Sequence, residues 1–282
     1  MRRFVNGLVT IALAAYIVLI LLALFSDRLI FQPQTSTYRD GDLITAAHGQ
    51  GIAEAQVVKI RSAVYDTGNK QTSPATITGL YLPNPAASYT LLFSHGNAED
   101  LGADLPLLDI YRRAGFAVFA YDFRGYGTSE GRASEAGVYA DVEAAYKTLT
   151  TELGVPASRI ISIGRSLGSA AAIHLATTHP VAGLIVEAPF LSAFRVLTHI
   201  QLLPWDKFNN ASKIRRVKVP VLVIQGDADE VVPFQHGQRI FELANEPKQK
   251  LWIHGAHHND VLLTATQKYL DTLTQFTSGF KN

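Results

Sequence analysis

The chain of 282 residues lacks cysteine and has few charged side chains. Without cysteine, disulfide bonds, zinc sites with thiolate ligands and lipid attachment through a cysteine sulfur are all excluded. Asp, Glu, Lys and Arg together make up 17% of the residues, although about a quarter is usual. The formal net charge is +1, so we expect no nucleic-acid partner.

Internal repeats and low-complexity tracts are absent as well. What the sequence does have is apolar residues in sufficient number for one sizeable core, since 48% of the chain is hydrophobic. Open and barrel-shaped α/β sheets of this length often form a single domain. We therefore expect one large domain.

The N-terminal region contains a long stretch without charge. Arg2 and Arg3 are followed by no charged residue until Asp27, and the 18 residues from Leu8 to Phe25 are almost entirely apolar. As a helix they would be about 27 Å long, close to the roughly 30 Å hydrocarbon core of a bilayer. The stretch predicts a transmembrane helix, so we expect residues 1–30 to anchor the chain in a membrane.

A cleaved signal peptide is the alternative for this stretch. Its apolar region is usually about 7 to 15 residues long and ends at a small-x-small site, which "ALFSDRLIF" (23–31) does not offer. We therefore favour an uncleaved signal-anchor. Arg2 and Arg3 predict a cytoplasmic N-terminus by the positive-inside rule, with the rest of the chain on the periplasmic or extracytoplasmic side.

Beyond a polar stretch at 35–54, which we expect to be irregular, strand and helix patterns alternate. The first two strands flank a turn-rich loop and predict an antiparallel pair. The later strands are largely apolar and predict a mostly parallel sheet with helices on both faces, whose sites lie at the carboxyl ends of the strands. The predicted strands are 57–65, 76–83, 89–96, 116–127 with its turn, 160–164, 183–190, 221–227 and 250–256, and helices are predicted at 104–115, 135–153, 234–245 and 260–277.

Ser166 stands between two glycines in "GRSLG" (164–168), after a β-branched run and before an alanine-rich helical run. This is G-x-S-x-G in a strand–turn–helix context. A nucleophile on such a tight turn needs neighbours without a Cβ, and the following helix presents its N–H groups to developing negative charge. The pattern therefore indicates a nucleophilic serine, which in turn needs a base and an orienting acid.

Candidates for the base and the acid follow two later strands of the predicted sheet. His257 and His258 come directly after the last strand, in "IHGAHHND" (253–260). Asp227, Asp229 and Glu230 follow the preceding strand, in "QGDADEVVP" (225–233). Both loops should open at the same edge of the sheet as the serine. At this point either histidine and any of the three acids can complete the set.

Five motifs together resemble the α/β-hydrolase superfamily, whose nucleophile, acid and histidine follow one another in this order. The chain is most similar to the branch of membrane-anchored serine hydrolases that includes depalmitoylating thioesterases and uncharacterised bacterial hydrolases. The motifs span most of residues 57–277. They are "SHGNAED" (94–100), "YDFRGYGTSEG" (121–131), "GRSLGSAAA" (164–172), "VLVIQGDADEVVP" (221–233) and "GAHHND" (255–260).

The resemblance implies which residues carry the chemistry. In the family pattern G-x-x-D-x-x-V-P the acid falls on Asp229, and in G-A-G-H-N-D the histidine falls on His258. This sequence departs from the second pattern, because His257 stands where glycine is usual. The oxyanion-hole donors correspond to the backbone N–H groups of Asn97 and Leu167.

The implied architecture is an α/β-hydrolase fold of about eight strands at 57–282, behind the anchor at 1–30 and a linker at 31–56. The insertion at 191–214, with Leu202, Leu203, Trp205 and Phe208, lies where the family places its lid. It is either an apolar cover over the substrate or ordinary packing of a crossover helix. For His95, Asp122 and Arg124 we expect structural roles.

The implied activity is cleavage of a carboxylic ester or thioester by a serine hydrolase with catalytic residues Ser166, Asp229 and His258. Its partner would be a small-molecule or lipid-like acyl substrate, without metal or cofactor. Two alternatives remain: a serine peptidase with prolyl-oligopeptidase-like chemistry, and a catalytically silent, membrane-anchored binding protein. The peptidase group usually carries a large extra domain for which this chain has no room.

Overall fold

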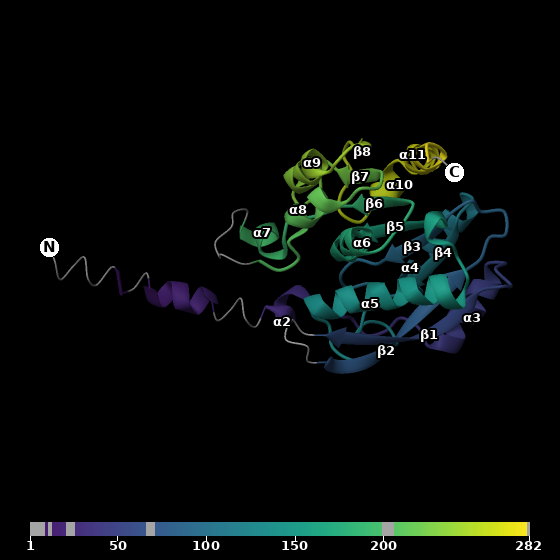
Figure 1. The fold of residues 1–282 in the computed structure, drawn as a ribbon, viewed down its shortest axis with the longest axis horizontal. Helices are drawn as coiled ribbons and strands as arrows, with labels where there is room; N and C mark the ends of the chain where they lie inside the picture. Colours follow the sequence, from purple (N-terminus) through teal and green to yellow (C-terminus); the bar gives the residue numbers. More distant parts are fainter. Residues whose placement is uncertain (1–8, 11–12, 21–25, 66–70, 199–205, 281–282) are drawn as a thin grey trace.

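The computed structural model describes residues 9–10, 13–20, 26–65, 71–198 and 206–280 (Figure 1). Their core is an eight-stranded sheet with the strand order β1-β2-β4-β3-β5-β6-β7-β8. β1 pairs antiparallel with β2, and β2 with β4, whereas all other neighbours are parallel. The predicted sheet is therefore confirmed. The strands are β1 (Gln56–Tyr65), β2 (Gln71–Leu82), β3 (Thr90–Ser94), β4 (Ala117–Tyr121), β5 (Ile160–Arg165), β6 (Gly183–Glu187), β7 (Val221–Gly226) and β8 (Lys248–Ile253).

Helices cover both faces of this sheet (Figure 1). One face packs against α3 (Asp40–Gly49), α4 (Leu101–Arg113), α10 (Val261–Thr264) and α11 (Thr266–Ser278). The other packs against α5 (Glu135–Lys147), α6 (Leu167–Thr178) and α9 (Phe234–Leu243). The shorter elements are α2 (Asp27–Ile30), α7 (Ala193–Thr198), α8 (Asn210–Lys213), a π-helical turn η1 (Thr148–Glu152), and the 3₁₀ turns η2 (Ala157–Arg159) and η3 (Ile214–Arg216).

The apolar strands are the reason that two helical layers form. In β3, Leu91 and Phe93 are buried against one layer while Leu92 is buried against the other, because successive side chains of a strand point to opposite faces. Burying each such side chain contributes roughly 1.5–3 kcal/mol relative to exposure. A strand that is apolar at every position therefore needs cover on both sides.

The predicted transmembrane helix is wrong. Within the described part of the chain, no helix is long and apolar enough to cross a membrane. The described helical stretch at 13–20 has eight residues, which at 1.5 Å per residue is about 12 Å. The rest of the predicted anchor at 1–8, 11–12 and 21–25 lies outside the described residues. The single-pass topology that we derived from this helix, with a cytoplasmic N-terminus and an extracytoplasmic catalytic domain, is wrong for the same reason.

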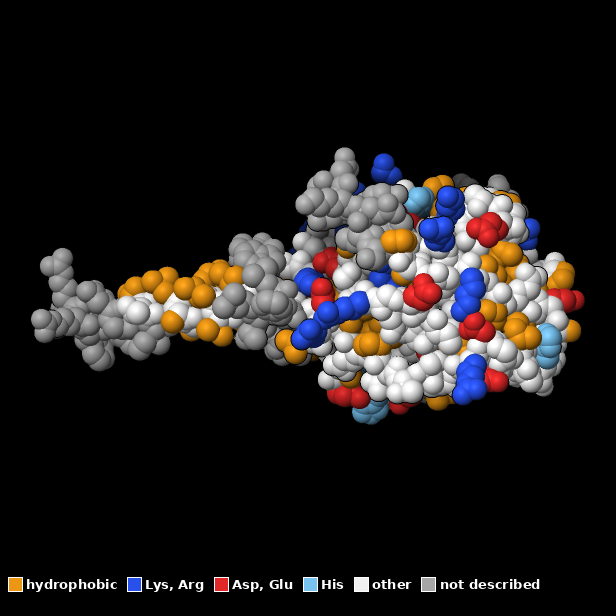
Figure 2. All heavy atoms as spheres, turned by 90° about the horizontal axis from the view of Figure 1, so that it is seen from below, with side chains coloured by type: hydrophobic (Ala, Val, Ile, Leu, Met, Phe, Trp, Pro, Cys, Tyr) orange, Lys and Arg blue, Asp and Glu red, His pale blue; other side chains and the backbone are white. Residues whose placement is uncertain are grey.

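The surface charges are mixed in sign (Figure 2), in agreement with the formal net charge of +1. Figure 2 shows basic and acidic side chains interspersed on the face in view, with no large area of one sign. Apolar side chains of the described N-terminal residues lie exposed on the segment that projects from the body, among them Leu13 and Ile17.

We expected residues 35–54 to be irregular, but they contain the ten-residue helix α3. Leu43 and Ala47 lie one helical turn apart and are buried, and Asp40 and Asp42 occupy the first turn, where acidic side chains favour a helix. Phe31 and Tyr38, ahead of this helix, are buried as well. The segment thus belongs to the packed body.

The insertion at 191–214 contains α7 and α8. Leu202, Leu203 and Trp205, which we considered as an apolar cover, lie outside the described residues. Phe208 is fully buried and packs edge-on against the rings of Phe31 and Phe190. Its ring is therefore part of the protein core, as in the packing alternative.

Candidate active site

Ser166 occupies the sharp turn between β5 and α6. Its backbone has φ 51° and ψ −116°, a region that non-glycine residues rarely adopt and that costs about 1–3 kcal/mol. Gly164 and Gly168 must be glycine, because a Cβ at either position would collide with the backbone. A Cβ on Gly164 would lie 2.1 Å from the carbonyl oxygen of Gly168, and a Cβ on Gly168 would lie 2.0 Å from that of Ser94. The Ser166 N–H donates to the carbonyl oxygen of Glu187 at 2.9 Å.

His258 lies against this serine, with Nε2 3.0 Å from Ser166 Oγ. Its other ring nitrogen, Nδ1, lies 2.9 Å from Oδ2 and 3.0 Å from Oδ1 of Asp229. Both side chains are largely buried, with 7% of His258 and 8% of Asp229 exposed. Three residues that are far apart in the sequence are thereby joined in one line of hydrogen-bonding contacts.

The loop after β7 fixes the Asp229 carboxylate. Oδ1 accepts the backbone N–H groups of Val231 at 2.9 Å and Val232 at 2.8 Å. Oδ2 lies 3.4 Å from the side-chain nitrogen of Gln225. These three donors hold the carboxylate in position facing His258.

The other candidates lie in ion pairs at the surface, His257 with Glu230 and Asp227 with His254. His257 Nδ1 lies 3.0 Å from Glu230, and His254 Nδ1 lies 2.8 Å from Asp227. These carboxylates raise the pKa of both histidines, and the histidines help to lower the pKa of both acids. The side chain of His257 is 59% exposed. The two pairs flank the contact between His258 and Asp229 and link the same two loops.

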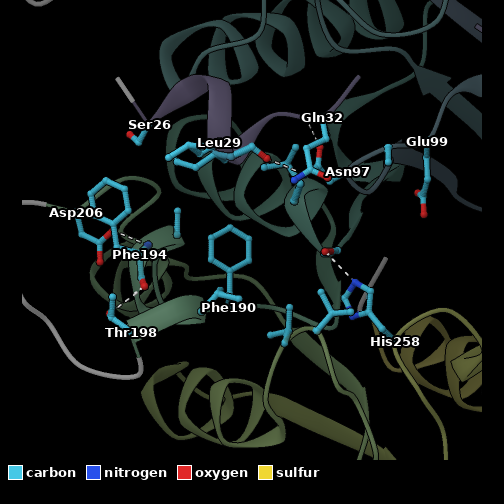
Figure 3. A pocket seen from close by; sticks show the side chains of 18 of the residues that line it. Ser26, Leu29, Gln32, Asn97, Glu99, Phe190, Phe194, Thr198, Asp206 and His258 are labelled. Carbon is cyan, nitrogen blue, oxygen red and sulfur yellow. Dashed lines mark hydrogen bonds between the residues drawn. The ribbon is translucent and has the colours of Figure 1, made fainter. Parts of the chain in front are cut away.

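Asn97 and Leu167, the expected oxyanion-hole residues, both line the cavity that contains Ser166. Leu167 is the first residue of α6, and the first N–H groups of a helix have no partner within it. Asn97 lies in the turn of residues 95–100 between β3 and α4, which we call the oxyanion loop. Its side chain is hydrogen-bonded to the main chain of Ile30 and Gln32 (Figure 3).

An ion pair between residues far apart in the sequence joins the oxyanion loop to the turn that contains Ser166. Arg165, the residue before Ser166, contacts Glu99 through its guanidinium group. The other oxygen of Glu99 accepts the N–H of Gly96 at 2.7 Å. Nothing in the local sequence pattern indicates this pairing, because its members are 66 positions apart.

His95 has the structural role that we expected, because its ring contacts the backbone of the oxyanion loop and of the turn after β4. Burial lowers the pKa of His95 to about 4, so its ring is neutral at pH 7. Nδ1 contacts the carbonyl oxygen of Gly96 at 2.7 Å, and Nε2 accepts the N–H of Phe123 at 3.2 Å. Arg124 pairs with Asp141 at 2.7 Å.

A cavity of about 500 Å³ opens beside Ser166 and His258. Figure 3 shows His258 on one side of it, Phe194, Thr198 and Asp206 on the opposite side, and Phe190 between them. Its two carboxylates are engaged, since Glu99 pairs with Arg165 and Asp206 accepts from Ser192 and from the Phe194 N–H. Most of the lining is apolar and includes Leu19, Leu29, Ile30, Leu167, Phe190, Phe194, Val196, Val231 and Val232.

Sequence reasoning missed Ser26, Leu29, Ile30 and Gln32 of this lining. The adjacent apolar residues of "LIFQPQ" (29–34) are a local signal for Leu29 and Ile30 alone. Among the described residues, no group of three or more His, Asp and Glu side chains could hold a metal ion.

The sheet, its helical layers and a serine on a strained strand–helix turn define an α/β-hydrolase. Residues 85–210 match the family described as serine aminopeptidase, S33. Over 198 residues the chain is 40% identical to human alpha/beta hydrolase domain-containing protein 17B. This alignment covers 69% of this chain and 68% of the human protein. It is 41% identical over 197 residues to the mouse protein 17C, over 69% of this chain and 61% of the relative.

The chain therefore belongs to the α/β-hydrolase superfamily, in the branch that contains the alpha/beta hydrolase domain-containing proteins 17B and 17C. It is a hydrolase. The resemblance predicted from its motifs is thus confirmed. Solved structures agree on the fold. An esterase of Pyrococcus furiosus superposes with a TM-score of 0.66 at 17% identity, over 89% of this chain and 98% of the esterase. An alpha-beta hydrolase of Vibrio vulnificus gives 0.66 at 19% identity, over 85% and 87%.

Proposed function

We propose that this hydrolase cleaves a carboxylic ester or thioester through an acyl-enzyme on Ser166. The observation that carries the proposal is the line of contacts from Ser166 Oγ through His258 to Asp229, at 3.0 and 2.9 Å. The first distance allows proton transfer from the nucleophile to its base, and the second allows the acid to orient that base by a hydrogen bond. The line ends at an apolar cavity that suits an acyl chain.

The chemistry follows from these positions. Ser166 Oγ attacks the acyl carbon while its proton passes to His258 Nε2, and the anionic Asp229 stabilises the resulting imidazolium. The N–H groups of Asn97 and Leu167 stabilise the oxyanion. When the tetrahedral intermediate collapses, the C–O or C–S bond breaks and His258 returns the proton to the leaving alcohol or thiol. Water then attacks the acyl-Ser166 by the same steps and releases the acid.

The first test is covalent labelling of the nucleophile. A fluorophosphonate probe phosphonylates a serine that is activated by a neighbouring base, with loss of fluoride. We expect the wild type to be labelled and Ser166→Ala to remain unlabelled in a gel-based fluorescence assay. Ser158→Ala, at an exposed position before the amino end of β5, is the matched control and should label fully. Equal labelling of Ser166→Ala would contradict the proposal, and an unlabelled wild type would favour a silent binding protein.

The second test is a series of aryl esters with acyl chains of increasing length. Each methylene buried in the cavity contributes about 0.8 kcal/mol, so kcat/KM should rise about fourfold per methylene until the cavity is full. Paired oxygen and sulfur esters of one acyl group then separate ester from thioester preference. A flat or falling series from acetyl to hexanoyl would remove the acyl-binding role of the cavity.

A peptidase is the second candidate, and the description of the matched family as serine aminopeptidase favours it. An aminopeptidase needs a free anionic group for the substrate's ammonium. In the cavity, Glu99 is paired with Arg165, and Asp206 accepts from Ser192 and the Phe194 N–H. Aminoacyl arylamides with a free amine, added to the ester series, should therefore show no turnover.

A further inference from the structure

The oxyanion loop has a conformation that needs support from outside. Ala98, next to Asn97, has φ 60°, and a non-glycine residue in this left-handed region costs about 1–3 kcal/mol. The loop therefore keeps this conformation because contacts with the surrounding structure stabilise it. Some of these contacts come from residues 30–38, far earlier in the chain, and we call this segment the brace.

The first contact of the brace is with Asn97. The side-chain Nδ2 donates to the carbonyl oxygen of Ile30 at 2.7 Å, and Oδ1 accepts the N–H of Gln32 at 3.0 Å. The same Oδ1 accepts the hydroxyl of Tyr126 at 2.6 Å. The amide is thus held on both its polar atoms by the main chain of the brace, as Figure 3 shows for Gln32 and Asn97.

The second contact lies at the other end of the loop. Asp100 accepts the N–H of Thr37 at 2.7 Å and its hydroxyl at 2.5 Å. Asp100 also caps α4 by accepting the N–H of Ala103 at 2.9 Å, and only 4% of its surface is exposed. The brace therefore fixes the oxyanion loop at Asn97 and again where the loop enters the helix.

The brace is itself anchored in the body. Phe31 is 5% exposed and lies edge-on to Phe208. Tyr38 is 8% exposed, and its hydroxyl donates to Asp122. A segment held by two buried rings can hold the loop in place, because packed side chains keep their positions.

We propose that the brace positions the backbone N–H of Asn97 for catalysis, an inference that rests on the proposed serine-hydrolase function. Losing an oxyanion donor typically lowers kcat by about 10²–10³. A donor that is displaced rather than lost should lower kcat by about tenfold or more. KM should stay within about twofold, because the donor acts on charge that develops only in the transition state.

A proline at position 32 tests the main-chain contact. Gln32→Pro removes the N–H that Asn97 accepts, and Gln32→Ala removes the same side chain but keeps the N–H. Phe31 already has φ −91° and ψ 125°, the extended conformation that a residue before proline requires. We expect kcat for an aryl ester to be at least about tenfold lower in Gln32→Pro than in Gln32→Ala, with unchanged circular dichroism.

A second pair of variants keeps the test valid if the proline disturbs folding. Thr37→Val removes the hydroxyl at nearly constant shape, and Thr37→Ser keeps it. We expect a severalfold lower kcat in Thr37→Val than in Thr37→Ser at similar KM. Asn84→Ala is the distant control, since its side chain bonds to the Arg112 carbonyl oxygen and the Ala86 N–H at the opposite edge of the sheet, and it should match the wild type.

The outcomes separate the brace from the proposed function. Equal kcat within both pairs, while Ser166→Ala is inactive, would overturn the brace and leave the serine hydrolase standing. A change in KM alone would overturn the brace too, because it would assign the segment to substrate binding. Wild-type turnover in Ser166→Ala would overturn the proposed function and the brace with it.

Discussion

Replacing His258 with alanine should lower turnover of an aryl ester by about 10⁶-fold, to the level that the oxyanion hole and binding alone provide. The reason is that Nε2 of His258 lies 3.0 Å from Ser166 Oγ, and a serine without a base is a weak nucleophile. The variant should fold, because the ring is at the edge of the cavity rather than in the core. Steady-state kinetics with circular dichroism measures both properties.

His257→Gly is the matched control for this prediction. His257 is exposed, and its Nδ1 faces Glu230. That carboxylate raises the pKa of His257 and engages its Nδ1, whereas the ring that contacts Ser166 is that of His258. The substitution also restores the glycine of the family pattern, so activity should stay within a few-fold of wild type. An inactive His257→Gly together with an active His258→Ala would transfer the role of base to His257.

Those features of the site that depend on local pattern could be predicted from the sequence. Ser166 was found because a tight strand–helix turn forces glycine at 164 and 168, where a Cβ would collide with backbone atoms. The strands were found because a sheet covered on both faces needs apolar residues at successive positions. The choice between adjacent candidates such as His257 and His258 came from the resemblance, since spacing alone left both open.

Contacts between distant segments could not be predicted in this way. The pairs of Ile30 with Asn97, Thr37 with Asp100 and Arg165 with Glu99 lie more than 60 positions apart, and no periodicity links them. The start of α4 at Leu101 was missed because it depends on the cap by Asp100 rather than on an apolar pattern. The anchor prediction rested on hydropathy alone, and it failed because no helix within the described residues is long and apolar enough to cross a membrane.

Replacing Asp229 with asparagine should lower kcat by about 10⁴-fold, with the fold intact. Oδ1 accepts two backbone N–H groups, from Val231 and Val232, so the amide oxygen must take this place. The amide NH₂ then occupies the position of Oδ2, 2.9 Å from Nδ1 of His258. Facing a donor, Nδ1 must become the acceptor, which moves the ring proton to Nε2. That nitrogen can no longer accept the proton of Ser166.

Asp227→Asn is the control for this change, two residues away in the same loop. Asp227 accepts the Gly255 N–H at 2.7 Å and faces the exposed His254, and an amide oxygen can keep the first of these bonds. We expect its kcat to stay within about threefold of wild type, as surface ion pairs contribute little. Kinetics of the two variants on one aryl ester decide the assignment. A larger loss in Asp227→Asn than in Asp229→Asn would move the role of orienting acid to Asp227.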